Sequence, residues 1–579
     1  MIEGVLGLGG GSDWRITLLW LITTPLFVTY LITTLNSTPL PNKFRSSKRP
    51  RTLPYVVPFL GHLVSFGLRG RAMMLEAAKR FGPSTPFYVY IPSIPQYATS
   101  GPQHISALFK SKGVSHHEAT LVAMEKCFGL PKAAYDIYAA DDGGYLPMPA
   151  PGSKVDPDKR VFYDIHTLVN TNLSGESLVG ITSRYQTFLA QQLSDIEEIG
   201  DDWVELPDLY AFMQHHVMKA AMVSMFGPYI LSLNPTFMED FWPWTQDIGP
   251  LFMDLPRWLI PASFRRRTRM LENIKRWQKH AHENFDCNKI APEDIDWEPY
   301  WGSKYSRKRQ TLFGRWEEMD ATAKAADDLG FIWAANANAI PAATWFLLEI
   351  LSDQSLHTRV QSEFSSAVAL LSPPCKIPTY EIDKLCSGPL CQSIFAETLR
   401  LRVAVAMSRQ AATDMDFCGW DIKKGERLYI GSYIEAMDET IWNTGSESDP
   451  HPLDTFWADR FLVYPNDPTS GPLKPAQPSK PTKANTNGQK AEDRGEPRFT
   501  LQGLTNSWIP FGGGARLCPG RHFAKQEIIS TAAIMTAAFD IELKRKGWKP
   551  HSDENYFGFG TLPPKEKIPV RIRRRQAKA

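Results

Sequence analysis

Near the C-terminal end, residues 508–525 read Trp-Ile-Pro-Phe-Gly-Gly-Gly-Ala-Arg-Leu-Cys-Pro-Gly-Arg-His-Phe-Ala-Lys. Three consecutive glycines, Gly512–Gly514, free the backbone to fold closely against a flat object. Cys518 follows between turn-forming residues, where an apolar pattern with helical spacing begins. At a helix N-terminus, free amides and the positive end of the helix dipole favour the thiolate form of a cysteine. The stretch therefore predicts a single thiolate presented to a buried metal.

The pattern Phe-x-x-Gly-x-Arg-x-Cys-x-Gly is met at every fixed position, by Phe511, Gly514, Arg516, Cys518 and Gly520. It resembles the haem-binding loop of the cytochrome P-450 superfamily of haem-thiolate monooxygenases. The resemblance implies haem b as the cofactor, Cys518 as the axial ligand of its iron, and these five residues as the cofactor-binding loop. It also makes Arg516 a partner of a haem propionate.

Composition bounds the fold class and the partners. The chain has 579 residues, of which 43% are hydrophobic and 22% charged, as in a globular protein. Length alone would suggest several domains of ~150 residues each. The resemblance instead implies a mainly α protein with small β-sheets, in which residues 65–579 form one catalytic domain of the cytochrome P-450 fold behind an N-terminal membrane anchor. A net charge of +2 predicts no attraction to nucleic acid.

The cysteines argue against a disulfide framework. Their number is odd, and none belongs to a CxxC pair or a zinc-type spacing, which favours a reducing compartment. Only Cys518 has a context that demands chemistry. The full set is Cys127, Cys287, Cys375, Cys386, Cys391, Cys418 and Cys518.

Residues 1–42 are predicted to form a membrane anchor. The segment 16–42 carries no charge, and 16–34 is close to the ~20 apolar residues that a spanning helix needs. A cleaved signal peptide is the alternative, but no small-residue cleavage site stands out. The next residues, 43–64, form a basic, proline-rich hinge. Its positive charges predict that the bulk of the chain lies in the cytosol. The hinge resembles that of the microsomal enzymes of the family, which implies a single-pass protein of the endoplasmic reticulum membrane.

An almost uncharged segment, 327–351, is predicted to be a buried helix. Pro341 should kink it, because proline lacks an amide proton and clashes with the preceding turn. In the family, the corresponding helix crosses the distal face of the haem and carries an acid followed by Thr. The best register puts Asn338 and Ala339 at those catalytic positions, which leaves an amide, or water held by it, facing the ligand.

The amino-acid sequence around Asn338 resembles one branch of the superfamily more than the others. The run Trp-Ala-x-x-Ala-Asn-x-Ile-Pro-Ala, residues 333–342, resembles the branch of cholesterol 7α-hydroxylase, sterol 12α-hydroxylase and prostacyclin synthase. The C-terminal turn Phe557–Gly560 resembles the turn that reaches into the substrate pocket of prostacyclin synthase. A plain hairpin turn is compatible with the same residues.

Two further arginine motifs fit the resemblance. Glu397 and Arg400 lie at i, i+3 on one helix face, a weak motif alone. The later segment Asp-Arg-Phe resembles the Pro-Glu-Arg-Phe of the family, so Arg460 is expected to join the other two in a buried structural triad. Arg409, just before a predicted hairpin, is expected to be a second propionate partner. The usual Trp-x-x-x-Arg is missing, and His166 is a weak substitute.

Residues 465–498 are rich in Pro, Ser, Thr, Asn, Gly and Lys and are predicted to be a disordered insertion. No flavin or dinucleotide motif accompanies the haem loop. The family therefore implies a separate NADPH-dependent reductase, docking on the face of Arg521, His522 and Lys525, unless those charges are simply solvated.

Two functions remain open at this stage. The first is a monooxygenase that uses O2 and reductase-supplied electrons to hydroxylate or oxidise a bulky apolar substrate, such as a sterol, triterpenoid or other terpenoid. The second is a haem-thiolate isomerase or dehydratase that rearranges a peroxide without a reductase. The absent acid and Thr at Asn338 and Ala339 make the second credible.

Overall fold

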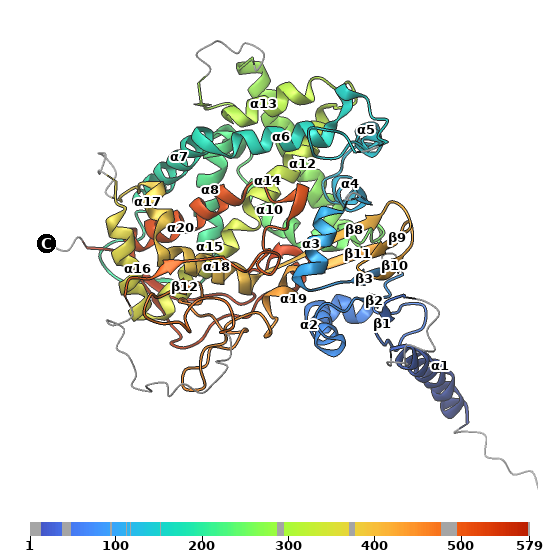
Figure 1. Cartoon of the computed structure of the whole chain (residues 1–579). Coiled ribbons are helices and arrows are strands. Elements are labelled where there is room, and N and C mark those ends of the chain that lie inside the picture. Colours follow the sequence, from blue (N-terminus) through green and yellow to red (C-terminus); the bar gives the residue numbers. More distant parts are fainter. Residues whose placement is uncertain are drawn as a thin grey trace, which may run out of the picture. The chain divides into compact units, whose positions relative to one another are not determined.

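The computed structural model describes residues 13–37, 48–92, 95–111, 113–115, 117–150, 152–286, 295–369, 377–475 and 495–576. Figure 1 labels the helices and strands of the chain. The chain divides into two compact units. The first contains residues 1–116 and 407–434, and the second contains residues 117–406 and 435–579. The sequence predicts one domain over 65–579. The contacts divide it because residues 407–434 return to complete the N-terminal sheet.

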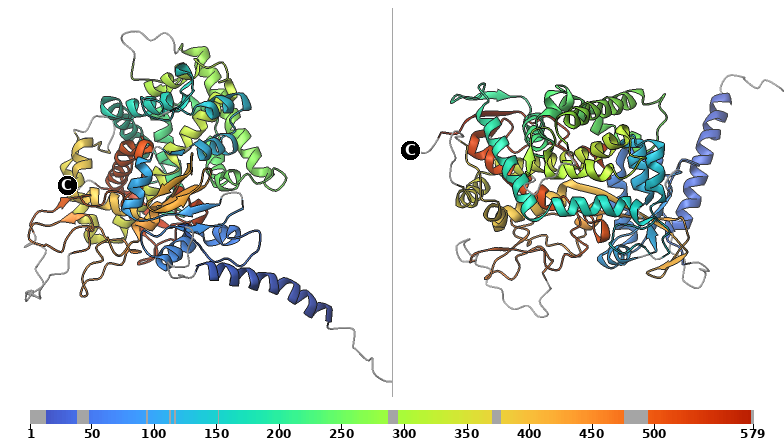
Figure 2. Two further views of the ribbon diagram at one scale, coloured as in Figure 1. Left: turned by 45° about the vertical axis from the view of Figure 1, so that its right-hand side comes forward. Right: turned by 90° about the horizontal axis from the view of Figure 1, so that it is seen from above.

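The first unit begins with the predicted anchor helix. Helix α1 (Asp13–Ser37) is one long helix, as Figure 2 also shows, with Pro25 inside it. By length and composition, its residues Trp14–Ser37 could cross a membrane, and most of its apolar side chains are exposed. Such side chains need a lipid or protein environment to cover them. The remainder of the predicted anchor, 1–12 and 38–42, lies outside the described residues.

The predicted hinge, 43–64, is tied to its own unit where the structure describes it, from residue 48. The Thr33 hydroxyl at the end of α1 donates to the Tyr55 carbonyl at 3.0 Å and accepts from the Tyr55 amide at 3.2 Å. The Lys48 carbonyl accepts from the Asp421 amide at 3.1 Å. The described part of the hinge is therefore held by hydrogen bonds to α1 and to residue 421.

The sheet of the first unit has the strand order β1-β2-β3-β11-β8, and β4 pairs along β8. Strands β1 and β2 are parallel, β2 and β3 antiparallel, and β3 and β11 parallel. The elements are β1 (Arg51–Thr52), α2 (Leu63–Phe81), β2 (Phe87–Val89), β3 (Gln96–Ala98), α3 (Pro102–Lys110), β4 (Val114–Ser115), β8 (Val403–Ala411), the hairpin β9 (Met415–Phe417) and β10 (Trp420–Ile422), and β11 (Arg427–Gly431), with α19 (Ser432–Ala436) at the boundary.

The second unit is mainly helical. Its first helices are α4 (His117–Val122), the π-helix Ala123–Cys127, α5 (Lys132–Ala140), α6 (Val161–Asn172), α7 (Gly175–Ser194), α8 (Leu209–Phe226), α9 (Tyr229–Ser232), α10 (Phe237–Gln246), α11 (Ile248–Phe252) and α12 (Pro261–Asn284). They are followed by α13 (Lys304–Phe313), α14 (Ala321–Asn336), α15 (Ala339–Ser352), α16 (Gln354–Ser366), α17 (Ile382–Ser387), α18 (Pro389–Arg402) and α20 (Arg521–Ala538).

Short sheets complete the second unit. Three antiparallel strands have the order β14-β16-β5, and β15 pairs with the first residues of β8. The strands are β5 (Val204–Leu206), β6 (Trp297–Glu298), β7 (Gly302–Ser303), β12 (Leu462–Val463), β13 (Arg498–Phe499), β14 (Phe539–Leu543), β15 (Phe559–Thr561) and β16 (Val570–Arg574). The predicted class, mainly α with small sheets, is confirmed.

The core of the second unit surrounds α15, which buries its side chains from Ala339 to Ile350. Helix α20 packs against both α15 and α7, and α7 packs against α8 (Figure 1). The segment 321–352 is long and apolar enough to cross a membrane, but it is largely buried inside the protein. It is a buried core segment, as the nearly complete lack of charge in 327–351 predicts.

The predicted insertion 465–498 has ordered flanks. The Asn443 amide side chain donates to the carbonyls of Thr469 and Gly471, both at 2.8 Å. At the other end, β13 pairs with β12. The prediction of disorder is therefore wrong for 465–475 and 495–498, because this side chain and a strand pairing satisfy their backbone groups. Residues 476–494 lie outside the described residues.

One buried carboxyl group in the α7–α20 interface has no compensating partner among the described residues. Glu527 is fully buried, and neither of its carboxyl oxygens has a hydrogen-bond partner there. Around it, Tyr185 bonds to Thr531 and Gln186 bonds to Ser530. Burial raises the pKa of Glu527 to about 8. At neutral pH this carboxyl group is therefore protonated and uncharged.

Replacing Glu527 with Gln should change how stability depends on pH. An unfolded chain releases this proton near pH 4.5, whereas the folded chain keeps it up to about pH 8. Between these values the wild type therefore loses stability as pH rises, by roughly 1.4 kcal/mol per pH unit. We expect Glu527→Gln to match the wild-type melting temperature at pH 4.5 and to exceed it by several degrees at pH 8. Equal melting temperatures at pH 8 would contradict this.

Candidate haem-thiolate site

The loop that carries Cys518 is shaped by glycine. Gly512 has φ +72° and Gly514 has φ +67°, values at which only glycine is unstrained. These turns bring the chain back on itself, so that the Cys518 amide donates to the Phe511 carbonyl at 3.0 Å. Helix α20 begins at Arg521, three residues after the cysteine. The predicted position of Cys518 just before a helix is confirmed.

The Cys518 sulfur faces the start of α20. The backbone amides of Gly520 and Arg521 donate hydrogen bonds to it and lower its pKa, as does the Arg521 charge. Burial has the larger effect and leaves the pKa of Cys518 raised overall. The expected lowering by the free amides at the helix start is present, but desolvation of the sulfur outweighs it. A bound metal cation would supply the missing charge, since a coordinated thiol is deprotonated.

Gly520 contributes to the surroundings of the sulfur through its backbone. Its φ is −80°, which any residue adopts, and an added Cβ would lie 4.0 Å from the Cys518 sulfur, an ordinary contact. The glycine is therefore not needed to let the chain approach the sulfur. Its amide, donated to that sulfur, is the contribution that the structure supports.

The other described cysteines differ from Cys518. Burial raises the pKa of Cys127 to about 12 and that of Cys386 to about 11. It also raises the pKa of Cys391 well above its usual range. Cys418 is exposed, and all the described cysteines are free thiols. Cys287 and Cys375 lie outside the described residues. Among the described cysteines, only Cys518 has backbone amides that lower its pKa against the effect of burial.

The cysteine loop is fixed to helix α18. The indole nitrogen of Trp508 donates to the Ala396 carbonyl at 3.1 Å, and the ring of Phe511 stacks on Phe395 with centroids 6.4 Å apart. Ala396 and Phe395 precede Glu397 directly in α18. The position of the thiol therefore depends on how firmly α18 is held.

A buried ion triad holds α18. Arg400 donates to both carboxylate oxygens of Glu397, at 2.7 and 2.8 Å, and Arg460 donates to one of them at 3.0 Å. The Trp457 amide donates to the same carboxylate at 3.2 Å. All three charged side chains have no exposed surface. Burial alone would raise the pKa of Glu397, but the two guanidinium groups outweigh it and hold the pKa below its usual value. The predicted triad is confirmed.

Arg516 is surrounded by residues that no motif identified. Its guanidinium donates to the Thr120 hydroxyl at 2.7 Å and lies 4.8 Å from the centre of the Tyr145 ring. Tyr145 in turn contacts His166, with ring centroids 5.5 Å apart. Burial, and then the charge of Arg516, lower the pKa of His166. His166 is therefore neutral near pH 7 and would bind a carboxylate only as a hydrogen-bond donor.

Arg409 belongs to the first unit, in β8, and is buried. One of its guanidinium nitrogens donates to the Ser408 carbonyl at 2.8 Å. Its predicted role as a second propionate partner stays a prediction.

The predicted distal helix is broken where proline demands it. Helix α14 ends at Asn336 and α15 begins at Ala339. Pro341 has no amide proton for the Ala337 carbonyl, four residues earlier, so the break lies just before the proline. The predicted kink is confirmed.

The catalytic roles expected for Asn338 and Ala339 stay predictions, and the structure gives their surroundings. Ala339 is 5% exposed. The side-chain oxygen of Asn338 is occupied, because it accepts a hydrogen bond from the Thr561 amide at 2.9 Å. Ala334, one turn earlier, is exposed although its helix lies in the core, and Asn338 is half-buried. These two residues mark the side of the helix that a bound group could reach.

The predicted reductase face is partly engaged inside the protein. Arg521 donates to the Cys518 carbonyl at 3.0 Å, and the Lys525 ammonium donates to the side chain of Gln392 at 2.7 Å. Burial lowers the pKa of Lys525. His522 is exposed. Two of the three charges thus have structural partners, which a purely solvated face would not require.

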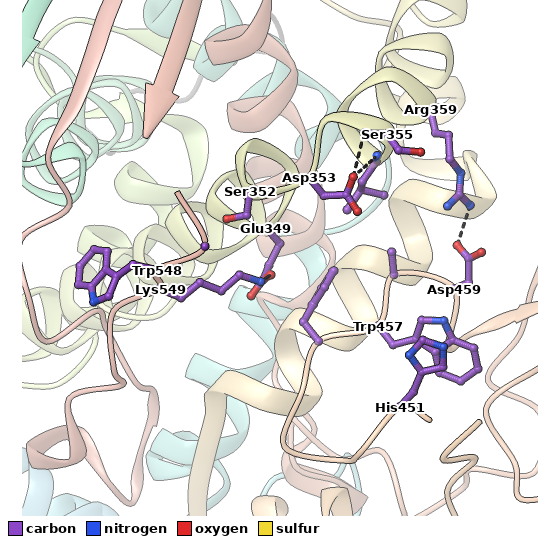
Figure 3. A pocket seen from close by; sticks show the side chains of 14 residues that line it. Glu349, Ser352, Asp353, Ser355, Arg359, His451, Trp457, Asp459, Trp548 and Lys549 are labelled. Carbon is purple, nitrogen blue, oxygen red and sulfur yellow. Dashed lines mark hydrogen bonds and ion pairs between the residues drawn. The ribbon is translucent and has the colours of Figure 1, made fainter. Parts of the chain in front are cut away.

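A surface pocket of about 360 Å³ lies elsewhere, where the end of α15 meets α16 and the segments 451–459 and 547–549 (Figure 3). Its charges pair with one another: Arg359 with Asp459 at 2.6 Å, and Lys549 with Glu349. Asp353 caps α16 by accepting from its first amides. The Cys518 loop does not line this pocket, and its satisfied charges indicate a structural role.

Comparisons with known proteins agree with this geometry. A family model described as Cytochrome P450 matches residues 197–454 and 493–570. The chain is 42% identical over 536 residues to cytochrome P450 monooxygenase fsoE of Humicola fuscoatra, covering 91% of this chain and 88% of that protein. It is 42% identical over 567 residues to cytochrome P450 monooxygenase efuG of Hormonema carpetanum, covering 96% of each.

A more distant relative is the cholesterol 7-alpha-monooxygenase of Cricetulus griseus, which is 28% identical over 385 residues, 64% of this chain and 66% of that protein. The fold and the cysteine loop are those of a haem-thiolate oxidoreductase. The chain belongs to the cytochrome P450 family and is a monooxygenase. Members of this family hold haem iron through a cysteine thiolate and generally receive electrons from a redox partner.

The triad gives a direct test of what holds the site. Glu397→Gln leaves two buried guanidinium groups without their counter-charge, which should cost about 3–5 kcal/mol. We expect a large loss of thermal stability and little haem retained after purification, measured by differential scanning fluorimetry and the Soret absorbance per protein. The matched control is Glu381→Gln, since Glu381 pairs with Lys384 at the same i, i+3 spacing but both side chains are exposed. Comparable losses in both variants would contradict the role of the triad.

Proposed function

We propose that Cys518 is the axial ligand of haem b in this protein. The observation that carries this proposal is the arrangement of its sulfur, which is held at the start of α20 by the amides of Gly520 and Arg521. A soft, partly buried sulfur with two amide donors suits haem iron, and the amides would tune the potential of that iron. Arg516 would bind a propionate, assisted by Thr120 and Tyr145.

The residues present fit such a cofactor. Cys518 supplies one sulfur donor, Arg516 supplies a cation for a carboxylate, and Ala334 supplies a small, exposed surface on an otherwise buried helix. When bound, haem would supply the activation of O2 that a monooxygenase needs. The protein's own part is to hold the sulfur, neutralise a propionate and keep the substrate close to the iron.

We further propose that the substrate is a bulky apolar molecule of the sterol, triterpenoid or other terpenoid kind. Support comes from the uncharged helix around Asn338 and from the similarity to a cholesterol 7-alpha-monooxygenase. The protein would work as a single-pass protein of the endoplasmic reticulum membrane, with α1 as its anchor and the catalytic domain in the cytosol. Its electrons would come from an NADPH-dependent reductase.

The ligand assignment is tested by Cys518→Ser, which keeps size but not the thiolate. We expect the reduced, carbon-monoxide-bound protein to lose the absorption band characteristic of haem-thiolate ligation. Cys418→Ser is the control, since it makes the same substitution at an exposed thiol. A variant at Cys518 that keeps the band would overturn the assignment.

The reaction is tested by turnover of a sterol and triterpenoid panel that includes cholesterol. With NADPH, reductase and ¹⁸O2, we expect one oxygen atom from O2 in the product and no product without the reductase. Product formed only from an organic hydroperoxide, without incorporation from O2, would instead support the isomerase alternative. The names of the closely related monooxygenases disfavour that alternative.

A further inference from the structure

The side chain in the break between α14 and α15 contacts the C-terminal turn rather than standing free. Strand β15 is the last strand of its sheet path and pairs with β8 in antiparallel register, Gly560 opposite Ala404 and Thr561 opposite Val403. The Thr561 amide points to the other side of the strand. There Oδ1 of Asn338 accepts its hydrogen bond at 2.9 Å. Because Thr561 is only 4% exposed, water cannot easily replace this acceptor.

Gly560 is fitted to the same side chain. It has φ +144°, and a Cβ added there would lie 1.9 Å from Oδ1 of Asn338. No side chain can occupy position 560 while Asn338 keeps this place. The amide at 338 and the glycine at 560 are therefore a matched pair, although 222 positions separate them in the chain.

Strand β15 also contacts helix α11. The Phe559 ring meets Phe252 edge to face, with centroids 5.6 Å apart and planes at 79°. A Cβ added at Gly249, in the same helix α11, would lie 3.5 Å from the Phe559 ring. On the other side of Thr561, the Leu562 carbonyl accepts from the Trp345 indole at 2.8 Å. Strand β15 therefore joins the broken helix to α11.

We propose that Asn338 is a positioning residue for substrate specificity: by holding the Thr561 amide, it fixes Phe559 against α11 and so sets the width of the space above the haem. This inference rests on the proposed function, in which haem is bound at Cys518 and a bulky apolar substrate is kept close to its iron. The helix break caused by Pro341 turns the residue at 338 towards β15, and a continuous helix would instead pack that face along its length.

Hydrogen exchange read at single-amide resolution on the purified holoenzyme tests the contact itself. Loss of the only side-chain acceptor in Asn338→Ala should raise the exchange rate of the Thr561 amide by about tenfold or more. The amides of Gly558 and Leu562 should change less, because they donate to β8 and Arg402 carbonyls. Asn338→Asp keeps an oxygen in the same place and should restore protection.

Asn336→Ala is the matched control. Asn336 carries the same amide side chain two residues earlier, at the end of α14, but that side chain donates to the Ile332 carbonyl at 2.9 Å and has no bond to β15. It should leave the exchange of Thr561 unchanged. If Asn338→Ala cannot be purified, Gly560→Ala should give the same faster exchange, because its Cβ displaces Oδ1. Unchanged exchange in Asn338→Ala or Gly560→Ala, or equal acceleration in Asn336→Ala, would overturn the proposal.

Haem ligands of different size test the effect on the pocket. Imidazole needs only the iron, whereas clotrimazole also fills the space above it, so each is titrated by the Soret shift. We expect Asn338→Ala to weaken clotrimazole binding by about fivefold or more, since the pocket wall is no longer preorganised, with imidazole binding unchanged. Equal clotrimazole affinity would contradict the specificity role. Absence of any azole shift in the wild type would refute the proposed haem site, while the exchange experiment would still decide the Asn338 contact.

Discussion

The carboxylate of Glu397, shared by two buried guanidinium groups, is the interaction on which the site depends. Three charges with no exposed surface are stable only when each is paired and hydrogen-bonded. That requirement fixes α18 relative to the segment around Trp457. The Ala396 carbonyl of the same helix accepts a hydrogen bond from the Trp508 indole. The position of the cysteine loop therefore depends on the triad that holds α18. The position of the Cys518 thiol therefore depends on the charge pairing of Glu397, which lies far earlier in the chain.

The proposed iron site is a compromise between burial and charge. Burial raises the pKa of Cys518, and the donated amides and Arg521 oppose it without reversing it. A thiolate that was fully stable without metal would need water, further hydrogen-bond donors or more positive charge around the sulfur. Here the partial compensation suits a ligand that becomes charged only when a cation binds it. The same reasoning separates Cys518 from the buried thiols Cys127 and Cys391.

The distal side is organised differently from the family pattern on which the predicted roles of Asn338 and Ala339 rested. A proline breaks the helix, the side chain at 338 turns to a strand near the C-terminus, and the small residue Ala334 is exposed instead. We interpret the polar side chain at 338 as a structural group that holds β15, where the family pattern has a group that takes part in the reaction. A bulky substrate requires a pocket of fixed shape. A pocket wall held by a hydrogen bond keeps its shape and still presents mostly apolar surface.

The sequence by itself determined the fold class, the cysteine loop, the kink at Pro341 and the triad. Each is a local pattern, since glycine spacing, a missing amide proton or a charge in an apolar helix has the same consequence wherever it occurs. Only the tertiary structure decided the surroundings of Arg516, the partner of Asn338 and the division into two units. Thr120, Tyr145 and Thr561 belong to no motif, because their roles come from distant segments that packing brings together. The order in 465–475 was missed for the same reason: its composition predicts disorder, but the side chain of Asn443 satisfies its backbone.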